Sequence, residues 1–466
     1  MKKYDLIVIG GGAAGFAAAI KADSIGARTL MVNGGIPIGG TCVNVGCVPT
    51  KFLLGIVKDY FKAKDYPFKS LQLKAEIDFA KLMQEKDNLV SYLRESNYQN
   101  VLKNLPGVTY KEGIARFLSA KEIEVKGERF TAPYFIIATG SSTRDISLEG
   151  LKEAGFLTHR TILESKKLPR SLLVIGGGPI GLELAQIFSR LGSKVTLVEV
   201  MEQILSPVEP IISYELTRYL GEEGIDILTG VKIKKVERKN NKKVVTIEKE
   251  KSSRKIEVEE ILLAAGVRGN SAYPGIENIG VEVDKGGFVR VNEFLQTSIP
   301  HIYAAGDVIG PPLLETVAAK EGNTAVRNAL SGEKVKIDYR NIPSAVFTSP
   351  QVAWVGMKEA EYTAKYGTCL CRKVDMEKIP RAMLGKETKG FIFMVIGHKD
   401  EKIKGVHVLS ELSAEIIHEA TLAIRQGLTI GDIINTVHVF PTFSEAVKIA
   451  AQVFKHSPEK MSCCVE

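Results

Sequence analysis

The chain has 466 residues, of which 45% are hydrophobic and 25% are charged. These proportions are those of an ordinary folded protein, and they exclude disorder, collagen-like sequence and a small disulfide-stapled scaffold. At roughly 150 residues per domain, the length predicts about three domains. The 62 Lys and Arg residues against 54 Asp and Glu residues leave a net charge of +8, a mild excess that gives little support to a polyanionic partner.

The densest basic stretch, residues 232–255, is interleaved with Glu237, Glu248 and Glu250 and has no aromatic side chains that could stack on bases. We therefore expect a solvated β-hairpin here rather than a nucleic-acid surface. No uninterrupted apolar run approaches the ~20 residues of a membrane-spanning helix. The chain is expected in the cytosol without membrane contact, where its six cysteines are reactive thiols or ligands rather than structural bridges.

An internal repeat organises the chain. When the sequence is shifted by 166 residues, Leu6–Asn33 aligns with Leu172–Glu199 without a gap, and ten of the 28 positions are identical. Each segment consists of a buried apolar strand, a glycine turn, a helix with apolar residues at helical spacing, and a second strand. The pattern predicts two βαβ units.

Each unit carries a G-x-G-x-x-G fingerprint between its first strand and its helix. The first glycine permits the turn, the second lets the backbone approach a pyrophosphate, and the third lets the helix close on the strand. Two fingerprints in this position predict two bound dinucleotides. The glycines are Gly10, Gly12 and Gly15 in the first unit and Gly176, Gly178 and Gly181 in the second.

The residue 23 positions after the first glycine contacts the ribose. In the second unit it is Glu199, which can accept a hydrogen bond from a free 2′-hydroxyl and would repel a 2′-phosphate. No Arg follows within ten residues, so this site favours NADH over NADPH unless Arg or Lys from elsewhere in the fold contributes. In the first unit Asn33 takes this place and can bond a ribose hydroxyl without carrying charge.

A cysteine pair follows the first βαβ unit directly, in GGTCVNVGCVPTK. Four residues separate Cys42 from Cys47, a spacing that can bring two sulfurs within bridging distance on one distorted helical turn. Pro49 suits the first turn of a helix, so Cys47 is expected near a helix N-terminus whose partial positive charge stabilises a thiolate. The pattern is typical of a redox pair.

Together these motifs resemble the flavin-dependent pyridine nucleotide–disulfide oxidoreductases. The resemblance covers essentially the whole chain, and it includes four further motifs in the family's order: IIATGSST near 136–143, LLAAGVRGN at 262–270, IYAAGDV at 302–308 and VFTSPQVAWVG at 346–356. It implies an α/β fold with two Rossmann-like dinucleotide-binding domains, one for FAD and one for NAD(P), and a C-terminal α+β dimerisation domain.

The resemblance also assigns residues. Cys47 would lie against the flavin ring, Cys42 would be the outer thiol that faces the substrate, and Lys51 would stand beside flavin N5, paired with Glu183. A fixed cation at that place favours negative charge on the reduced flavin. Further cofactor-binding residues implied by the shared motifs are Gly40, Thr41, Thr139, Gly140, Gly266, Gly306 and Asp307, with Asp307 near the ribityl chain.

The chain departs from the disulfide reductases of this family near its C-terminus. Those enzymes carry HPTxSE, in which the His exchanges protons with the substrate thiol and is oriented by the Glu. Here VFPTFSE places Phe440 where the His should be, while Glu445 remains. Phenylalanine carries no proton, and a positioned acid typically contributes about 10²–10⁴-fold. His438, two residues earlier on an extended segment, is a poor replacement.

The chain ends in MSCCVE, and Cys463 and Cys464 can present two thiolates to a soft metal ion. Mercuric reductases resemble this chain in both respects: they lack the acid-base His and end in a vicinal cysteine pair, which passes Hg(II) to the redox pair of the partner subunit. Two residues depart from the family pattern. Thr442 stands where mercuric reductases commonly have Tyr, and Pro179 replaces the Tyr that gates the nicotinamide site.

The resemblance thus implies a homodimeric mercury(II) reductase in which electrons from NAD(P)H pass through FAD to Hg(II) held by Cys42 and Cys47. One alternative is a disulfide reductase similar to dihydrolipoamide dehydrogenase or thioredoxin reductase; another is a flavoprotein that only sequesters soft metals. Cys369 and Cys371 alternate on an expected strand and would share one face of it. We interpret them as structural thiols, with ancillary metal binding as the alternative.

The expected domains are FAD-binding (1–146 and 270–338), NAD(P)-binding (147–269) and interface (339–466).

Overall fold

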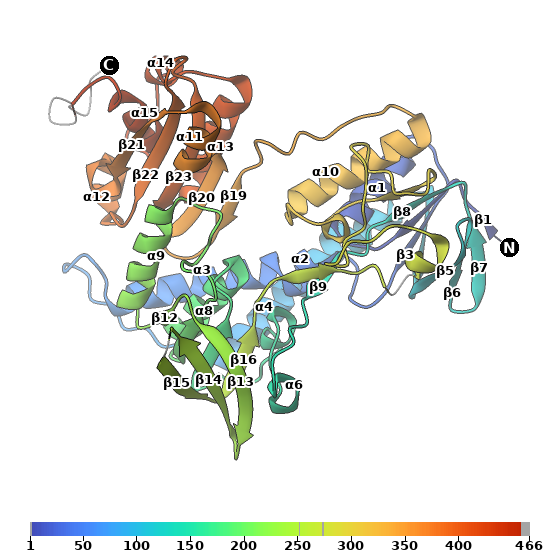
Figure 1. The fold of residues 1–466 in the computed structure, drawn as a ribbon, viewed down its shortest axis with the longest axis horizontal. Helices are drawn as coiled ribbons and strands as arrows, with labels where there is room; N and C mark the ends of the chain where they lie inside the picture. Colours follow the sequence, from blue (N-terminus) through green and yellow to red (C-terminus); the bar gives the residue numbers. More distant parts are fainter. Residues whose placement is uncertain (1, 251, 273–274, 458–466) are drawn as a thin grey trace.

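A computed structural model describes residues 2–250, 252–272 and 275–457 (Figure 1). Three lobes are visible, each built on its own sheet. The N-terminal lobe, blue and yellow in the figure, lies on the right, the green lobe lies below, and the orange and red C-terminal lobe lies at the upper left. Cys463 and Cys464 lie outside the described residues.

The N-terminal lobe contains a five-stranded parallel sheet. Its strands, in spatial order, are β18 (Ile302–Ala304), β8 (Tyr134–Ile137), β2 (Leu6–Ile9), β3 (Thr29–Asn33) and β4 (Val108–Glu112). Alternate residues of β2 point to opposite faces, because side chains in a strand alternate. Leu6 and Val8 pack against α1 (Ala13–Ser24) and α10 (Glu315–Val326), whereas Ile7 and Ile9 pack against a second sheet.

That second sheet covers the other face of the N-terminal lobe. Its order is β1 (Lys2–Lys3), β7 (Glu128–Thr131), β6 (Glu122–Val125) and β5 (Ala115–Ser119). The parallel sheet is therefore buried on both faces, which explains why its strands are continuous apolar runs rather than alternating ones.

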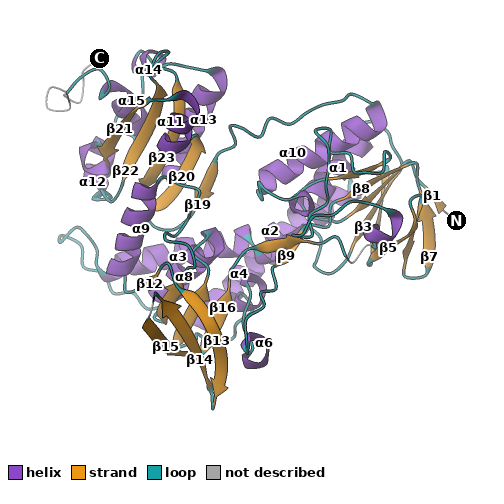
Figure 2. Ribbon diagram, viewed as in Figure 1, coloured by secondary structure: helices purple, strands orange, loops and turns teal. Residues whose placement is uncertain are grey.

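The second repeat builds the same layers. Its parallel sheet has the order β12 (Asp226–Leu228), β11 (Lys194–Val198), β10 (Ser171–Ile175) and β16 (Glu260–Leu263). Leu172 and Val174 face α8 (Pro179–Leu191) and α9 (Pro210–Glu222), whereas Leu173 and Ile175 face an antiparallel sheet. Each predicted βαβ unit is present, with helices on one face and an antiparallel sheet on the other (Figure 2).

The basic stretch belongs to this antiparallel sheet. The expected hairpin is present, with most of its lysines exposed, but a third strand joins it and one face is buried. The chain forms three strands, β13 (Lys232–Lys239), β14 (Lys242–Lys249) and β15 (Ser252–Val258). Val236, Val245 and Ile256 are buried against the parallel sheet. The second face of that sheet needs an apolar cover, and the apolar residues between the lysines supply it.

The C-terminal lobe is an antiparallel sheet covered by helices. Its order is β19 (Ser344–Val346), β20 (Gln351–Gly356), β23 (Ile403–Ser410), β22 (Phe391–Gly397) and β21 (Cys369–Asp375). The helices α13 (Ser413–Gln426) and α15 (Glu445–Gln452) pack on it through an apolar cluster. A long segment after α10 joins this lobe to the N-terminal one (Figure 1).

Helices carry the redox pair between the lobes. These are α2 (Gly40–Val45), α3 (Cys47–Lys64) and α4 (Phe79–Arg94), and α3 packs against both α4 and α8. By length and composition Gly40–Lys64 is apolar enough to cross a membrane, although Lys51 and Lys58 interrupt its apolar run, as the expectation of no uninterrupted run requires. Buried core helices pass the same test, and Leu53, Leu54 and Val57 of α3 lie in the core that it shares with α8.

The remaining described elements are short. They are α5 (Asn100–Lys103), α6 (Leu151–Ala154), α7 (His159–Ile162), α11 (Glu359–Tyr366), α12 (Pro380–Gly385), α14 (Ile430–Ile434), β9 (Ser141–Thr143), β17 (Val267–Gly269), η1 (Glu95–Gln99), η2 (Ile276–Ile279), η3 (Asp307–Ile309), η4 (Arg327–Ser331) and η5 (Met376–Lys378). Of these, β9 and β17 pair with each other in a two-stranded antiparallel sheet.

The third glycine of each fingerprint fixes how closely helix and strand approach. A Cβ at Gly181 would lie 2.0 Å from the carbonyl oxygen of Gly176, and one at Gly15 would lie 1.9 Å from that of Gly10. We expect Gly181→Ala to lower the free energy of unfolding by about 1–3 kcal/mol, as overpacking does, and so to lower the thermal unfolding midpoint.

A matched control is Gly221→Ala in α9, where no atom lies within 4 Å of the added Cβ. That change should leave stability unchanged or raise it by about 0.4–1 kcal/mol. Equal unfolding midpoints for the two variants, measured by calorimetry at the same cofactor content, would contradict the tight packing.

Candidate functional site

The two cysteines of the redox pair flank a break between two helices. Cys42 lies on α2, Gly46 interrupts the helix, and Cys47 is the first residue of α3. The expectation that Cys47 lies at a helix N-terminus is confirmed. Cys42 is half-buried and Cys47 is exposed, and all cysteines of the described residues are free thiols.

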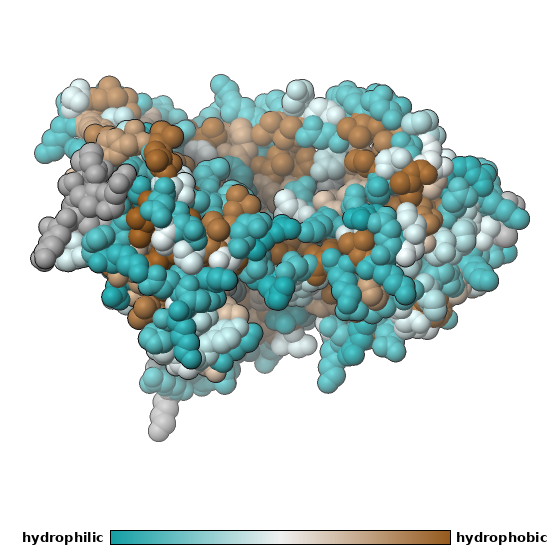
Figure 3. Space-filling model, turned by 90° about the horizontal axis from the view of Figure 1, so that it is seen from above, coloured by the Kyte–Doolittle hydropathy of each residue, from teal (hydrophilic) through white to brown (hydrophobic). Residues whose placement is uncertain are grey.

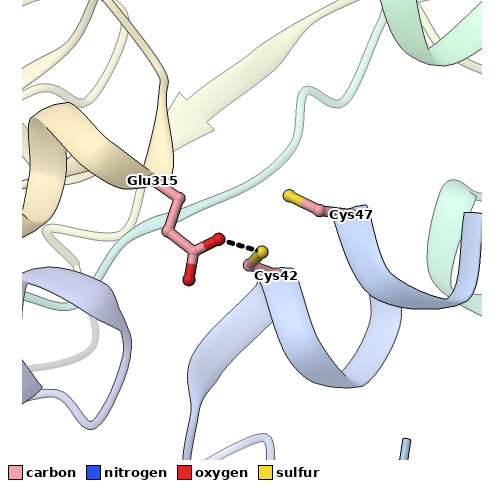
Figure 4. A group of neighbouring side chains, drawn as sticks. All are labelled: Cys42, Cys47 and Glu315. Carbon is pink, nitrogen blue, oxygen red and sulfur yellow. Dashed lines mark hydrogen bonds between the residues drawn. The ribbon is translucent and has the colours of Figure 1, made fainter. Parts of the chain in front are cut away.

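A carboxylate that the sequence did not single out completes this cluster. The Sγ atoms of Cys42 and Cys47 and a carboxylate oxygen of Glu315 all lie within 4.8 Å of one another (Figure 4). The Cys42 thiol donates a hydrogen bond to Glu315 Oε2, and the Tyr98 hydroxyl donates to Glu315 Oε1 at 3.5 Å. Glu315 is the first residue of α10, so it comes from a different helix than the two cysteines.

The two thiols are electrostatically unequal. The hydrogen bond to Cys47, burial and the nearby Glu315 carboxylate raise the pKa of Cys42 far above that of an ordinary thiol. The hydrogen bond from Cys42 and the Lys51 ammonium lower the pKa of Cys47. Burial and the same carboxylate raise the pKa of Tyr98. These opposite directions make Cys47 the more acidic of the two thiols.

An ion pair stands one helical turn from Cys47. Lys51 Nζ donates to Glu183 Oε2 at 2.7 Å, and the Glu183 side chain is 5% exposed. The other oxygen, Glu183 Oε1, accepts from the backbone N–H of Phe347 at 2.9 Å. Lys51 Nζ also lies 4.8 Å from the centroid of the Phe347 ring. The structure thus brings together the two residues that the resemblance paired.

The first fingerprint opens onto a cavity of about 260 Å³. Seven of the residues expected at the cofactor line it: Gly10, Gly12, Asn33, Gly40, Thr41, Thr139 and Gly140. The Asn33 side chain accepts from the Gly11 N–H at 3.1 Å and donates to the Ile36 carbonyl at 3.0 Å. It therefore shapes the turn in addition to facing the cavity.

The polar groups of this cavity suit a dinucleotide. Arg160 lines the cavity, and its buried Nε has no hydrogen-bond partner; a buried donor of this kind calls for an acceptor such as a phosphate or carbonyl oxygen. Asp307 and Gly306 lie outside this lining. Asp307 Oδ2 accepts from the lining residue Ser141 at 2.8 Å, and burial raises the pKa of this carboxyl. The N–H of Gly306 donates to Glu321 at 2.7 Å.

Sequence reasoning missed four polar residues of this lining. Asn270 stands at the end of a motif that was recognised, and Ser141 and Ser142 stand within another, so these three could have been found. Arg160 belongs to no motif and reaches the cavity from α7, so no local signal marks it.

The middle glycine of the second fingerprint, Gly178, faces open space. No atom lies within 4 Å of a Cβ placed on Gly178, and Pro179 begins α8 directly after it. Glu199 follows β11, and its two oxygens accept from the N–H groups of Gly177 at 2.6 Å and Met201 at 2.9 Å. Gly266 follows β16, and its carbonyl accepts from the Arg144 N–H at 3.0 Å.

The C-terminal segment presents Phe440 to solvent, with 54% of this residue exposed. Glu445 is the first residue of α15 and accepts from the Thr442 N–H at 3.1 Å. His438 is engaged at both ring nitrogens, with Thr436 O at 3.0 Å and Glu419 Oε1 at 2.8 Å. Within the described part of this single chain, no contact joins Glu445 to Cys42 or Cys47.

Comparison with known proteins gives the same assignment along the whole chain. Residues 4–327 match the pyridine nucleotide-disulphide oxidoreductase family, and residues 342–451 match the dimerisation domain of that family. The α/β fold class with two dinucleotide-binding domains and a C-terminal dimerisation domain is therefore confirmed.

Individual relatives differ in the substrate that their names state. The mercuric reductase of Bacillus cereus is 38% identical over 462 residues, which are 99% of this chain and 73% of that protein. The dihydrolipoyl dehydrogenase of Thermus scotoductus is 39% identical over 459 residues, 97% of each chain. A solved structure, the Cu(II) complex of the HOCl-induced flavoprotein disulfide reductase RclA from Escherichia coli, is 26% identical with a TM-score of 0.88 and covers 97% of this chain and 100% of its own.

Since family models match residues 4–327 and 342–451, and relatives at 38–39% identity cover 97–99% of the chain, the chain belongs to the pyridine nucleotide-disulphide oxidoreductases, enzymes that use FAD and NAD(P)H.

Proposed function

We propose that this oxidoreductase is a mercury(II) reductase. The balanced reaction is NAD(P)H + Hg²⁺ → NAD(P)⁺ + Hg⁰ + H⁺. The observation that carries the proposal is the cluster of Cys42, Cys47 and Glu315, because two sulfurs and a carboxylate oxygen within 4.8 Å of one another suit a soft divalent cation. Similarity to mercuric reductases over 99% of the chain supports it.

Bound FAD supplies two-electron transfer between the nicotinamide and the dithiol. The chain's residues prepare the metal end of this path. Cys47 is the thiol that more readily binds Hg(II) as a thiolate, since the pKa of Cys47 is lowered. Cys42 must release its proton on binding, and Glu315, which already accepts the hydrogen bond from Cys42, takes that proton.

Phe440 fits the same chemistry. A disulfide substrate releases a thiolate that needs an acid, whereas Hg(0) leaves as a neutral atom and needs none. His438 does not replace the missing acid, because both of its ring nitrogens are already engaged and its side chain is 8% exposed. Glu445, whose carboxylate accepts from Thr442, keeps a role in shaping this segment.

A homodimer follows from the matched dimerisation domain. The segment that carries Phe440 is apolar and exposed in the single chain, with Val437 at 89% and Val439 at 76%. Apolar side chains also gather in several patches on the face seen in Figure 3. We propose that this segment faces the partner subunit's dithiol and that Cys463 and Cys464 deliver Hg(II) there. A cytosolic location is consistent with reduced thiols.

A second candidate is a dihydrolipoyl dehydrogenase activity. The observation that favours it is 39% identity to the enzyme of Thermus scotoductus along 97% of each chain. Phe440 argues against it, since an acid at that place typically contributes about 10²–10⁴-fold.

The proposal predicts which electron acceptor supports NAD(P)H oxidation. We expect oxidation with Hg(II) and release of Hg(0) vapour, and little oxidation with lipoamide or with a disulfide protein. The measurement is absorbance of the reduced nicotinamide with each acceptor, together with vapour detection, for both NADH and NADPH. Rapid lipoamide turnover would favour the second candidate. Tight Hg(II) binding without any turnover would show a sequestering flavoprotein instead.

The substitution Phe440→His tests the role of the missing acid. Restoring an imidazole should raise disulfide reduction, by up to the ~10²–10⁴-fold of a positioned acid, while mercury turnover stays the same or falls. Phe440→Leu is the matched control, since it changes shape without adding a proton donor and should leave disulfide reduction low. An increase in mercury turnover for Phe440→His would count against the proposal.

Glu315 is predicted to set the pH dependence of the dithiol. Its negative charge raises the pKa of Cys42 and opposes the lowering of the pKa of Cys47. Glu315→Gln should therefore lower both values, so that iodoacetamide alkylates each thiol of the reduced enzyme at lower pH than in the parent enzyme, as followed by mass spectrometry of the two peptides.

The control for this variant is Tyr98→Phe, which removes the other hydrogen bond to Glu315 but keeps the carboxylate charge. Its alkylation profile should stay closer to that of the parent enzyme. Unchanged profiles in Glu315→Gln would exclude an electrostatic role for Glu315.

A further inference from the structure

A second cluster of sulfur ligands lies in the C-terminal lobe, on a different sheet from the redox pair. Cys369 and Cys371 share one face of the edge strand β21, and their Sγ atoms are 2.9 Å apart. A carboxylate oxygen of Glu359, at the start of α11, lies within 4.8 Å of both sulfurs. We propose that Cys369, Cys371 and Glu359 form a second metal site, which binds one thiophilic cation such as Hg(II).

Cys369 and Cys371 form an open dithiol. Their Sγ atoms are 2.9 Å apart, which exceeds the ~2.0 Å of a disulfide bond, and both residues are free thiols in the structure. The strand cannot pucker freely, because Cys369 and Cys371 are held in register with Gly397 and Val395 of β22. The two thiols are therefore expected to stay reduced and available.

A bridging cation does not require this close approach. At metal–sulfur distances of about 2.3 Å, two thiolates on opposite sides of an ion stand up to roughly 4.6 Å apart. The sulfurs reach that separation by rotation about their Cα–Cβ bonds while the ladder stays intact. Both cysteines are half-buried and Glu359 is exposed, so the ion has a route from solvent.

The carboxylates near Cys369 and Cys371 favour the binding of a cation there. Glu209 accepts a hydrogen bond from the Glu359 N–H, so a second carboxylate stands behind the first. Arg372 extends to the other side of the strand, where its guanidinium lies 5.4 Å from the Phe454 ring centroid. Binding of one divalent ion releases two thiol protons, 2 RSH + Hg²⁺ → Hg(SR)₂ + 2 H⁺.

This site does not depend on the proposed reaction, and a variant separates the two. In the cofactor-loaded variant C42S/C47S/C463S/C464S, Cys369 and Cys371 are the only two of the chain's six cysteines that remain. Titration with Hg(II) against a soluble monothiol, followed by ultraviolet thiolate-to-mercury absorption, should give one ion per chain and the release of two protons.

Removing a ligand should weaken this binding by amounts that reflect its role. When Cys369→Ser or Cys371→Ser is added to the four-serine variant, the affinity for Hg(II) measured against the monothiol should fall by at least roughly 10²-fold. The reason is that the second thiolate acts at high effective concentration. Glu359→Gln should lower the same affinity by about 10-fold, as for groups that support metal ligands. The matched control is Glu377→Gln, which changes an exposed carboxylate of the same lobe and should leave the affinity unchanged.

The native chain provides a test that does not depend on the folding of the four-serine variant. C369S/C371S should bind one Hg(II) fewer per chain than the parent and keep its NAD(P)H oxidation rate. Equal stoichiometry in these two proteins would overturn the proposal. So would a Cys369–Cys371 disulfide in freshly purified enzyme, detected by mass spectrometry.

Discussion

The Glu183 carboxylate is the constraint on which the geometry around the dithiol depends. It is buried, and its two oxygens are satisfied by Lys51 Nζ at 2.7 Å and by the backbone N–H of Phe347 at 2.9 Å. Only the carboxylate of this pair is buried, and leaving one of its hydrogen bonds unmade costs about 1–3 kcal/mol. Since α3, α8 and the segment after β19 each contribute one group, the three lobes are fixed relative to Cys47.

The features that the sequence predicted are those encoded by local periodicity and by the internal repeat. The 166-residue repeat predicted two parallel sheets that share one plan, and in each sheet alternate residues, such as Leu172 and Leu173, face a helical layer and an antiparallel layer. The glycine fingerprints and the Cys42 and Cys47 spacing predicted where the chain turns and where α3 begins. These features depend on residues close together in the sequence.

What escaped prediction depends on contacts between distant segments. Glu315 meets Cys42 across 273 positions of the sequence, and Arg160 reaches the cofactor cavity from a short helix with no motif of its own. The buried face of the basic stretch was not predicted, because its lysines dominate the composition. Its apolar residues were sufficient to cover one face of a neighbouring sheet, which no local pattern specifies.

The charges around the dithiol argue for a cationic substrate over a disulfide. The carboxylates of Glu183 and Glu315 and the more acidic thiol, Cys47, lie near the Lys51 cation. Under the proposed function, a divalent thiophilic ion brings positive charge to these carboxylates, and it displaces the Cys42 proton toward a carboxylate already in contact with that thiol. A disulfide brings no positive charge, and its cleavage adds a thiolate beside the same carboxylates. The arrangement that raises the pKa of Cys42 is therefore one that we propose suits metal binding better than disulfide cleavage.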